Sequence, residues 1–338
     1  MLTRVDEALK KVLTPVTIKQ TVDTTSPIVV LGGPALDRLV QVPYFPTVDG
    51  NVVATTMKRQ PGGVGANIAV GMAHLGNRVV LLGATGDDDT GEFLRRHLAE
   101  AGVDTSHMIT RRETDTHTCF IAVNPRGERT IYGLPGATTV EKPEELDHDV
   151  IRRARALHIA PAFKEVALAA IATAREAGIF VSYTPADVWW PHNPEVVRQI
   201  ARLVDLLIVN RIEAAALTGL EDPEEGVRQL LAWGYESAVL TRGEHGVLVG
   251  DHGQVISIPA CPAIGVRDTT GAGDAFTAGM VTGILIGLSL VQAARLGAAV
   301  AALKLRQAGA QAGLPTLEEA LELATQQAEA CPNYRTSI

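Results

Sequence analysis

Residues 268–276 combine glycines with acidic side chains immediately before an apolar stretch that predicts a helix. Gly271, Ala272 and Gly273 would leave their peptide N–H groups uncovered at the start of that helix. Such a helix start attracts phosphate, because the N–H groups point at the ligand and the helix dipole favours negative charge. Asp274 lies in the same turn, where a carboxylate can take a proton from an incoming hydroxyl group. The segment therefore predicts phosphoryl transfer to an alcohol.

Several other catalytic signatures are missing from the sequence. No lysine is followed by Ser or Thr, as a Walker A loop requires, and the third glycine of a dinucleotide fingerprint is replaced by Ile68 or Phe276. Neither G-x-S-x-G nor H-E-x-x-H occurs. These absences argue against a P-loop NTPase, an NAD enzyme, a serine hydrolase and a zinc protease. The structural alternative is that Asp274 only stabilises the positive end of the helix.

Charge and cysteine content restrict the compartment and the partners. The net charge is −8 without a long Lys/Arg cluster, so nucleic acid is not an expected partner. Cys119, Cys261 and Cys331 fit neither a disulfide framework nor a zinc spacing, which favours a reducing compartment. Residues 1–16 lack the apolar core of a signal peptide, and the apolar segment 278–290 is too short to span a bilayer. We expect a cytoplasmic protein without a membrane partner.

Strands and helices alternate along the chain of 338 residues, and beyond residue 150 the alternation is regular. Apolar runs ended by glycine, as at 28–33, are typical of buried parallel strands. The pattern predicts an α/β domain over 27–330, with a mostly parallel sheet covered on both faces, after an N-terminal extension of residues 1–26. Because ligands bind at the carboxyl ends of parallel strands, the motifs at strand-to-helix junctions should meet at that edge.

Short strands interrupt this alternation in two places, at about 38–60 and 117–133. The first stretch alternates loosely between apolar and polar residues, and Asn124–Gly127 in the second carries the residue types of a hairpin turn. We expect these strands to stand apart from the main sheet.

The segment DTTGAGDAF closely resembles the C-terminal signature of the ribokinase (PfkB) carbohydrate kinase family. PGGVGANIAVGMAHLG resembles the N-terminal signature of that family, and NRIEAAALTG, LTRGEHG and GAQAGLP continue the likeness in order over residues 28–318. The resemblance implies a ribokinase-like three-layer α/β/α domain whose short strands form a small β-sheet lid. It also implies an ATP-dependent carbohydrate kinase with Asp274 as the base. Because a sheet that stands off the core exposes its edges and one face, we expect a homodimer formed through the lids.

The resemblance assigns roles to further residues, each of which has a structural alternative such as a strand end, a helix cap or a hairpin turn. The residues that resemble sugar-binding positions are Asp37, Gly63 and Asn67. Those placed near the nucleotide are Asn210, Thr241 and Gly243, with Glu213 next to the hydration shell of Mg²⁺. Those that resemble a monovalent-cation site, with K⁺ as the candidate ion, are Asp268, Thr270 and Gly309 together with the region of Gly313.

The departures from the ribokinase pattern lie in the segments expected to form the acceptor pocket. The sequence has Asp49-Gly50-Asn51 where ribokinases often have Gly-Glu, no acidic residue at the end of ALHIAPAF, and Tyr183–Ala186 where many relatives have Asp-Pro-Asn. These departures argue against ribose itself. We expect phosphorylation of a hydroxymethyl group on a sugar or a similar small molecule. The alternatives are a nucleoside kinase, a non-catalytic sugar-binding protein, and a degenerate kinase retained as a regulator.

Overall fold

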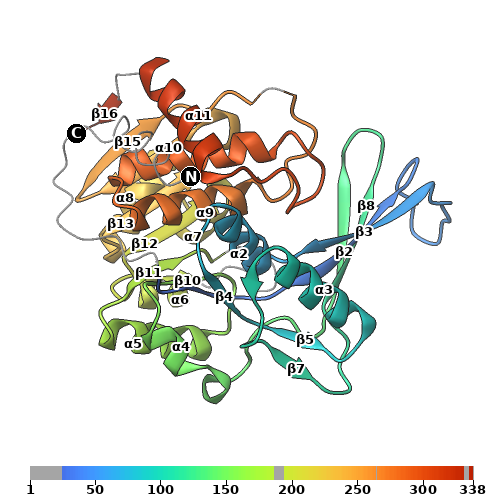
Figure 1. Cartoon of the computed structure of the whole chain (residues 1–338). Coiled ribbons are helices and arrows are strands. Elements are labelled where there is room, and N and C mark those ends of the chain that lie inside the picture. Colours follow the sequence, from blue (N-terminus) through green and yellow to red (C-terminus); the bar gives the residue numbers. More distant parts are fainter. Residues whose placement is uncertain (1–24, 186–193, 264, 331–334, 338) are drawn as a thin grey trace.

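A computed structural model describes residues 25–185, 194–263, 265–330 and 335–337 of the chain. Most of the N-terminal extension and Ala186 lie outside the described residues. Two separate β-sheets and a short two-stranded ribbon organise the rest. Figure 1 shows the larger sheet inside the body of the molecule and the smaller one projecting from it.

The large sheet has ten strands within the described residues, in the order β16-β15-β14-β13-β12-β11-β10-β1-β4-β6. The pairs from β13 through β12, β11, β10, β1 and β4 to β6 are parallel, whereas β14, β15 and β16 continue the sheet antiparallel. Strand β16 was not predicted from the sequence. The strands are β1 (Ile28–Leu31), β4 (Val79–Leu82), β6 (Val103–Asp104), β10 (Ala156–Ile159), β11 (Phe180–Tyr183), β12 (Leu206–Asn210), β13 (Ser237–Thr241), β14 (Val247–Asp251), β15 (Gln254–Ile258) and β16 (Arg335–Ser337).

Helices cover both faces of this sheet, and each face has its own hydrophobic core. Alternation along β1 divides its side chains between the two cores: Ile28 and Val30 join one, and Val29 and Leu31 join the other. The helices on the first face are α2 (Val64–His74), α9 (Ala272–Leu285), α10 (Leu290–Lys304) and α11 (Leu317–Ala330). Those on the second are α4 (His148–Arg152), α5 (Lys164–Glu176), α6 (Pro194–Ile200), α7 (Arg211–Thr218) and α8 (Pro223–Trp233). This arrangement confirms the predicted three-layer α/β/α fold.

At the β6 edge of the large sheet, helix α3 (Asp89–Glu100) packs near the two-stranded ribbon of β5 (Ala84–Gly86) and β7 (Ile109–Arg111). Most of the apolar segment 278–290 belongs to α9, whose residues from Ala275 to Gly283 are buried. No helix among the described residues is long and apolar enough to cross a membrane.

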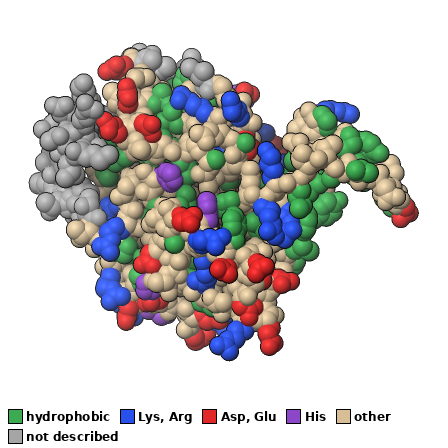
Figure 2. All heavy atoms as spheres, turned by 45° about the vertical axis from the view of Figure 1, so that its right-hand side comes forward, with side chains coloured by type: hydrophobic (Ala, Val, Ile, Leu, Met, Phe, Trp, Pro, Cys, Tyr) green, Lys and Arg blue, Asp and Glu red, His purple; other side chains and the backbone are tan. Residues whose placement is uncertain are grey.

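The smaller sheet has four strands in the order β3-β2-β8-β9: β2 (Ala35–Gln41), β3 (Thr56–Gly62), β8 (Thr118–Val123) and β9 (Arg129–Leu134). Its strands come from the two stretches predicted to stand apart, and the turn at 124–127 joins β8 to β9. Figure 2 shows it as an arm that carries hydrophobic side chains at the surface. At its base, Asp37 of β2 lies opposite Gln60 of β3 and close to the helix α2 that follows.

Candidate active site

The predicted motifs meet where the parallel strands end. Gly63 caps the start of α2, Asn210 ends β12 and caps α7, and Thr241 ends β13 directly beside Asn210 in the sheet register. Helix α9 begins next to α2, against which it packs (Figure 1). The carboxyl-end edge of the sheet therefore holds groups that are far apart in the sequence, as expected for a ligand site in an α/β sheet.

The start of α9 presents backbone N–H groups to open space. Gly271 has a φ of 75° and lies so close to the following loop that a Cβ there would come within 2.6 Å of the Ala310 carbonyl oxygen. A Cβ on Gly273 would meet no atom within 4 Å. Among the described residues, the N–H groups of Gly273 and Asp274 have no hydrogen-bond acceptor. Two such N–H groups at a helix start can donate hydrogen bonds to a phosphate oxygen.

Ala272 differs from the expectation that its N–H group faces a ligand. Its N–H donates to the carbonyl oxygen of Thr269 at 3.2 Å, because the chain makes a tight turn before it enters the helix. Of the three residues predicted to form the anion hole, Gly273 has its N–H group available and Gly271 supplies the backbone bend.

Asp274 is held in place by a chain of amides. Its Oδ2 accepts a hydrogen bond of 2.7 Å from Asn67 Nδ2, and Asn67 Oδ1 accepts one of 2.9 Å from Gln311 Nε2. Gln311 Oε1 in turn lies 2.8 Å from Nε2 of His97, on α3. Asn67, which the resemblance places at the acceptor, is thus also a direct hydrogen-bond partner of the Asp274 carboxylate.

The Asp274 carboxyl has an environment suited to a base near neutral pH. Burial raises its pKa to about 7, against the opposing hydrogen bond from Asn67, and the charges of Glu213 and Asp37 add to the rise. Burial also raises the pKa of Asp37 to about 6. A carboxylate with a pKa near the working pH combines a sufficient basic fraction with a useful affinity for the proton. The charges of Asp37 and Glu213 are thus electrostatically coupled to Asp274.

Asp37 lies at the junction between the small sheet and α2. A Cβ on Gly62 would come within 2.4 Å of Asp37 Oδ2, so the glycine makes room for this carboxylate. Gly63 has a φ of 93°, and a Cβ there would come within 2.4 Å of the Gly33 carbonyl oxygen. Gly62 thus lets the backbone pass close to a carboxylate that can accept hydrogen bonds from hydroxyl groups, and Gly63 lets the start of α2 pass close to the backbone of residues 33–35.

Asn210 and Glu213 form the capping box that the structural alternative predicts. Asn210 Oδ1 accepts from the N–H of Glu213 at 2.9 Å, and Glu213 Oε2 accepts from the N–H of Asn210 at 2.8 Å. Glu213 is nevertheless buried, and its charge reaches Asp274 and Tyr183, whose pKa values it raises. The residue therefore caps α7 and also contributes negative charge to the site.

The carboxylates fit Mg²⁺ bound mainly through a nucleotide. Among residues 25–185, 194–263, 265–330 and 335–337, no three His, Cys, Asp or Glu side chains form a group that could hold a metal ion. Mg²⁺ keeps several waters and is usually bound by one or two carboxylates together with substrate phosphates. Glu213, whose charge acts on Asp274, is the carboxylate that the resemblance implies for that role.

Thr241 and Gly243 lie where β13 turns back into β14. Thr241 is half-buried, whereas Gly243 is exposed and has a φ of 57°. The segment is therefore the hairpin turn of the structural alternative, and it lies at the same sheet edge as Asn210.

Asp268, Thr270 and Gly309 come together as the resemblance implies. Asp268 Oδ1 accepts from the N–H and the Oγ1 hydroxyl of Thr270 at 2.9 and 2.8 Å, and its Oδ2 accepts from the N–H of Gly309 at 2.8 Å. The positive charge beside them belongs to the chain itself, because Lys304 Nζ lies 3.4 Å from the carbonyl oxygen of Asp268.

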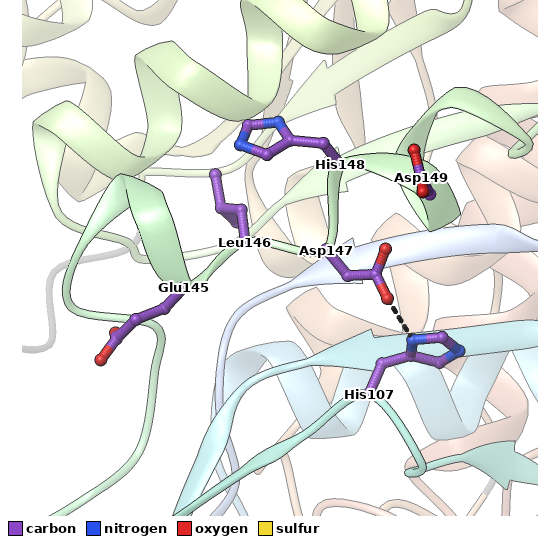
Figure 3. Close-up of a pocket in the computed structure, with 6 residues that line it drawn as sticks. All are labelled: His107, Glu145, Leu146, Asp147, His148 and Asp149. Carbon is purple, nitrogen blue, oxygen red and sulfur yellow. Dashed lines mark hydrogen bonds and ion pairs between the residues drawn. The ribbon is translucent and has the colours of Figure 1, made fainter.

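Another hollow lies away from this site, around the start of α4 (Figure 3). His107 pairs with Asp147 at 2.8 Å, and Glu145, His148 and Asp149 complete its polar lining. Because α4 leads into the amino end of β10, the hollow is separate from the carboxyl-end edge that carries Asp274. It has no glycine-rich helix start, and we assign it no role.

Sequence reasoning missed Lys304 and Gln311 as site residues. Gln311 lies in the GAQAGLP segment, which resembles the ribokinase family but assigns no role to this glutamine. Lys304 was detectable as a single charge at the end of the otherwise apolar run AAVAALKL. Such a charge on a buried helix is rare unless it has a partner.

Comparisons with known proteins identify the family of the chain. The profile of the pfkB family carbohydrate kinases matches residues 29–317. The chain is 31% identical to the ribokinase of Haemophilus influenzae, covering 87% of this chain and 96% of that protein. It is 28% identical to the nucleoside kinase of Methanothermobacter thermautotrophicus, covering 88% of this chain and 95% of the other.

Among solved structures, the Arabidopsis thaliana ribokinase complexed with ribose and ATP has a TM-score of 0.81 and 25% identity, covering 88% of this chain and 98% of the other. The family match extends over most of the folded domain, and it includes the start of α9 and the loop that follows α10. The chain therefore belongs to the pfkB family of carbohydrate kinases and is an ATP-dependent kinase.

Proposed function

We propose that this kinase transfers the terminal phosphoryl group of ATP to a hydroxymethyl group of a sugar or sugar-like acceptor, with Asp274 as the base. The observation that carries the proposal is the single turn that combines Asp274, at a pKa of about 7, with the unpaired N–H groups of Gly273 and Asp274. A nucleoside kinase is the second candidate, because the nucleoside kinase relative covers nearly the same share of the chain as the ribokinase relative.

In the proposed reaction, Asp274 accepts the proton of the acceptor hydroxyl as its oxygen attacks the terminal phosphorus of ATP in line. A new O–P bond forms, the bond between that phosphorus and the bridging oxygen breaks, and ADP leaves. The N–H groups of Gly273 and Asp274 donate to the transferred phosphoryl group as negative charge collects on its oxygens. Asn67 keeps the carboxylate oriented throughout. Bound Mg²⁺, next to Glu213, would neutralise phosphate charge.

Asp37 is the proposed partner of the acceptor hydroxyl groups. Its raised pKa and its place beside Gly62 and Gly63 support a carboxylate that exchanges water for a ligand's hydroxyls. The small sheet, to which Asp37 belongs, would act as a lid that excludes water from the phosphoryl group. Asn210, Thr241 and Gly243 would line the nucleotide side of the same edge.

An acceptor panel tests the proposal. Hexoses, pentoses, sugar acids and nucleosides are each incubated with MgATP, and ADP release is measured together with the phosphorylated product. We expect a sugar or sugar acid with a hydroxymethyl group to give the highest kcat/KM. Turnover of nucleosides alone would favour the second candidate, and ADP release without a phosphorylated acceptor would contradict both.

The pH dependence of kcat/KM should reveal the base. Because the unprotonated form of Asp274 is the active one, kcat/KM should be at its plateau above pH 7 and fall as the pH decreases through about 7. Asn67→Ala removes the hydrogen bond that lowers this pKa, so the acidic limb should move to higher pH.

Asn77→Ala is the matched control, since Asn77 also donates from a side-chain amide, to Met72 O and Thr282 Oγ1, but lies beyond the opposite end of α2. Its acidic limb should coincide with that of the wild type. An unchanged limb in Asn67→Ala would show that Asp274 does not set the pH profile.

The small sheet also supports a homodimer. Its edge strands β3 and β9 expose backbone groups, and the arm exposes Met57, Ile131, Tyr132 and Leu134, each by more than half. We expect size-exclusion chromatography with light scattering to give a mass twice that of the chain, which is 35.8 kDa. In the double variant Ile131→Ser, Tyr132→Ser, the measured mass should decrease toward that of a single chain. A monomeric wild type at all concentrations tested would refute the dimer.

A further inference from the structure

Lys304 is the largest side chain that is fully buried among the described residues, with an exposed fraction of 0%. It is the last residue of α10, where a positive charge is favoured by the negative end of the helix dipole. Removing an ammonium group from water costs roughly several kcal/mol of free energy unless the group is paired. The Lys304 ammonium group therefore needs hydrogen-bond acceptors or negative charges that compensate for its lost hydration.

Those partners belong to the loop that leads into the candidate active site. Lys304 Nζ donates to the carbonyl oxygen of Asp268 at 3.4 Å. Burial lowers the pKa of Lys304, whereas the negative charges of Asp268 and Asp274 raise it and so favour the ammonium form. The lysine charge in turn lowers the pKa values of both carboxyl groups. Lys304 is thus electrostatically linked to the proposed base.

The same loop is tied to the segment after α10 by several contacts. The N–H groups of Arg267 and Asp268 donate to the carbonyl oxygen of Leu305 at 2.8 and 3.4 Å. Asp268 Oδ2 accepts from the N–H of Gly309, and Gly271 packs against Ala310. Lys304 lies directly before this segment, so its ammonium group is built into the framework that fixes the start of α9.

We propose that the Lys304 ammonium group supplies the positive charge of this loop, so that the protein needs no added monovalent cation to hold its anion hole. Lys304 is accordingly a positioning residue, which acts on Asp274 and the neighbouring N–H groups through the Asp268 loop. The inference rests on the proposed function for its kinetic test, but its thermal test needs no substrate.

A cation panel on the wild-type protein tests the inference. The melting temperature and the turnover are measured in KCl, NaCl and choline chloride at equal ionic strength. Because a bound ion stabilises the folded state, a cation site would raise the melting temperature in the salt that fills it. We expect the same melting temperature and turnover in all three salts. A selective rise of either quantity in KCl would overturn the proposal. The melting temperature tests the proposal even if no acceptor is found, because it is measured without substrate.

Lys304→Met tests the positioning role, because methionine fills much of the space without the charge. We expect kcat to fall by about 10- to 100-fold and the KM of the acceptor to stay unchanged. This decrease is smaller than the decrease in kcat that removal of a direct anion-hole donor can cause. Lys142→Met, at an exposed position far from the site, should behave as the wild type. Lys304→Gln replaces the methionine variant if circular dichroism shows that the latter is unfolded. A folded variant with wild-type kcat would overturn the proposal.

Discussion

Asp274→Asn should reduce turnover by about 10²–10⁴-fold, the usual contribution of a general base. Asparagine has nearly the shape of aspartate and can stay next to Asn67, but its amide cannot accept the proton of the acceptor hydroxyl. ATP affinity should change little, because the N–H groups of the anion hole belong to the backbone. The measurements are ADP release with the best acceptor and nucleotide affinity by calorimetry.

Asp149→Asn is the control for the same chemical change. Asp149 is exposed in α4, where it pairs with Arg152, and it lies away from the carboxyl-end edge of the sheet. This variant should keep full turnover. Near-normal activity of Asp274→Asn on the physiological acceptor would remove Asp274 from the role of base.

Gly271→Ala should have the second largest effect, with a loss of about 10²-fold in kcat. The new Cβ would lie 2.6 Å from the Ala310 carbonyl oxygen, and a φ of 75° is unfavourable for alanine. The chain must shift at the start of α9, which moves the N–H groups of Gly273 and Asp274 relative to the phosphate. A displacement of about 1 Å is enough to cause such a loss.

Gly219→Ala separates the clash from the backbone strain. Gly219 has a φ of 73° at the end of α7, and a Cβ there would meet no atom within 4 Å. Both variants carry the cost of about 1–2 kcal/mol for a left-handed alanine, but only Gly271→Ala also meets an obstructing carbonyl group. Melting temperatures and kcat are compared for the two variants. An equal kcat would show that the position of Gly271 does not matter for catalysis.

The fold followed from the sequence because its main signals are local. Apolar runs such as 28–31 and 206–209, each followed by a turn or a helix cap, predict buried parallel strands, and the structure has strands there. The convergence of Gly63, Asn210 and Asp274 followed from topology, since all three stand at the carboxyl ends of strands or at the helix starts beside them. Strand β16 was missed, because a three-residue edge strand has too little pattern to be recognised.

Details of the site depended on contacts that the sequence does not encode locally. The hydrogen bond between Asn67 and Asp274 joins residues 207 positions apart, and the one between Gln311 and Asn67 spans 244 positions. Lys304 could be noticed as a charge in an apolar run, but its partner Asp268 is specified only by how α10 packs on α9. Side-chain partnerships of this kind arise from the tertiary structure.

The most direct measurement is a crystal structure with a non-hydrolysable ATP analogue and the acceptor selected by the panel. The terminal phosphate should accept hydrogen bonds from the N–H groups of Gly273 and Asp274, and the acceptor's hydroxymethyl oxygen should lie within hydrogen-bond distance of the Asp274 carboxylate. A terminal phosphate bound away from the start of α9, or an acceptor hydroxyl that contacts a different base, would contradict the account.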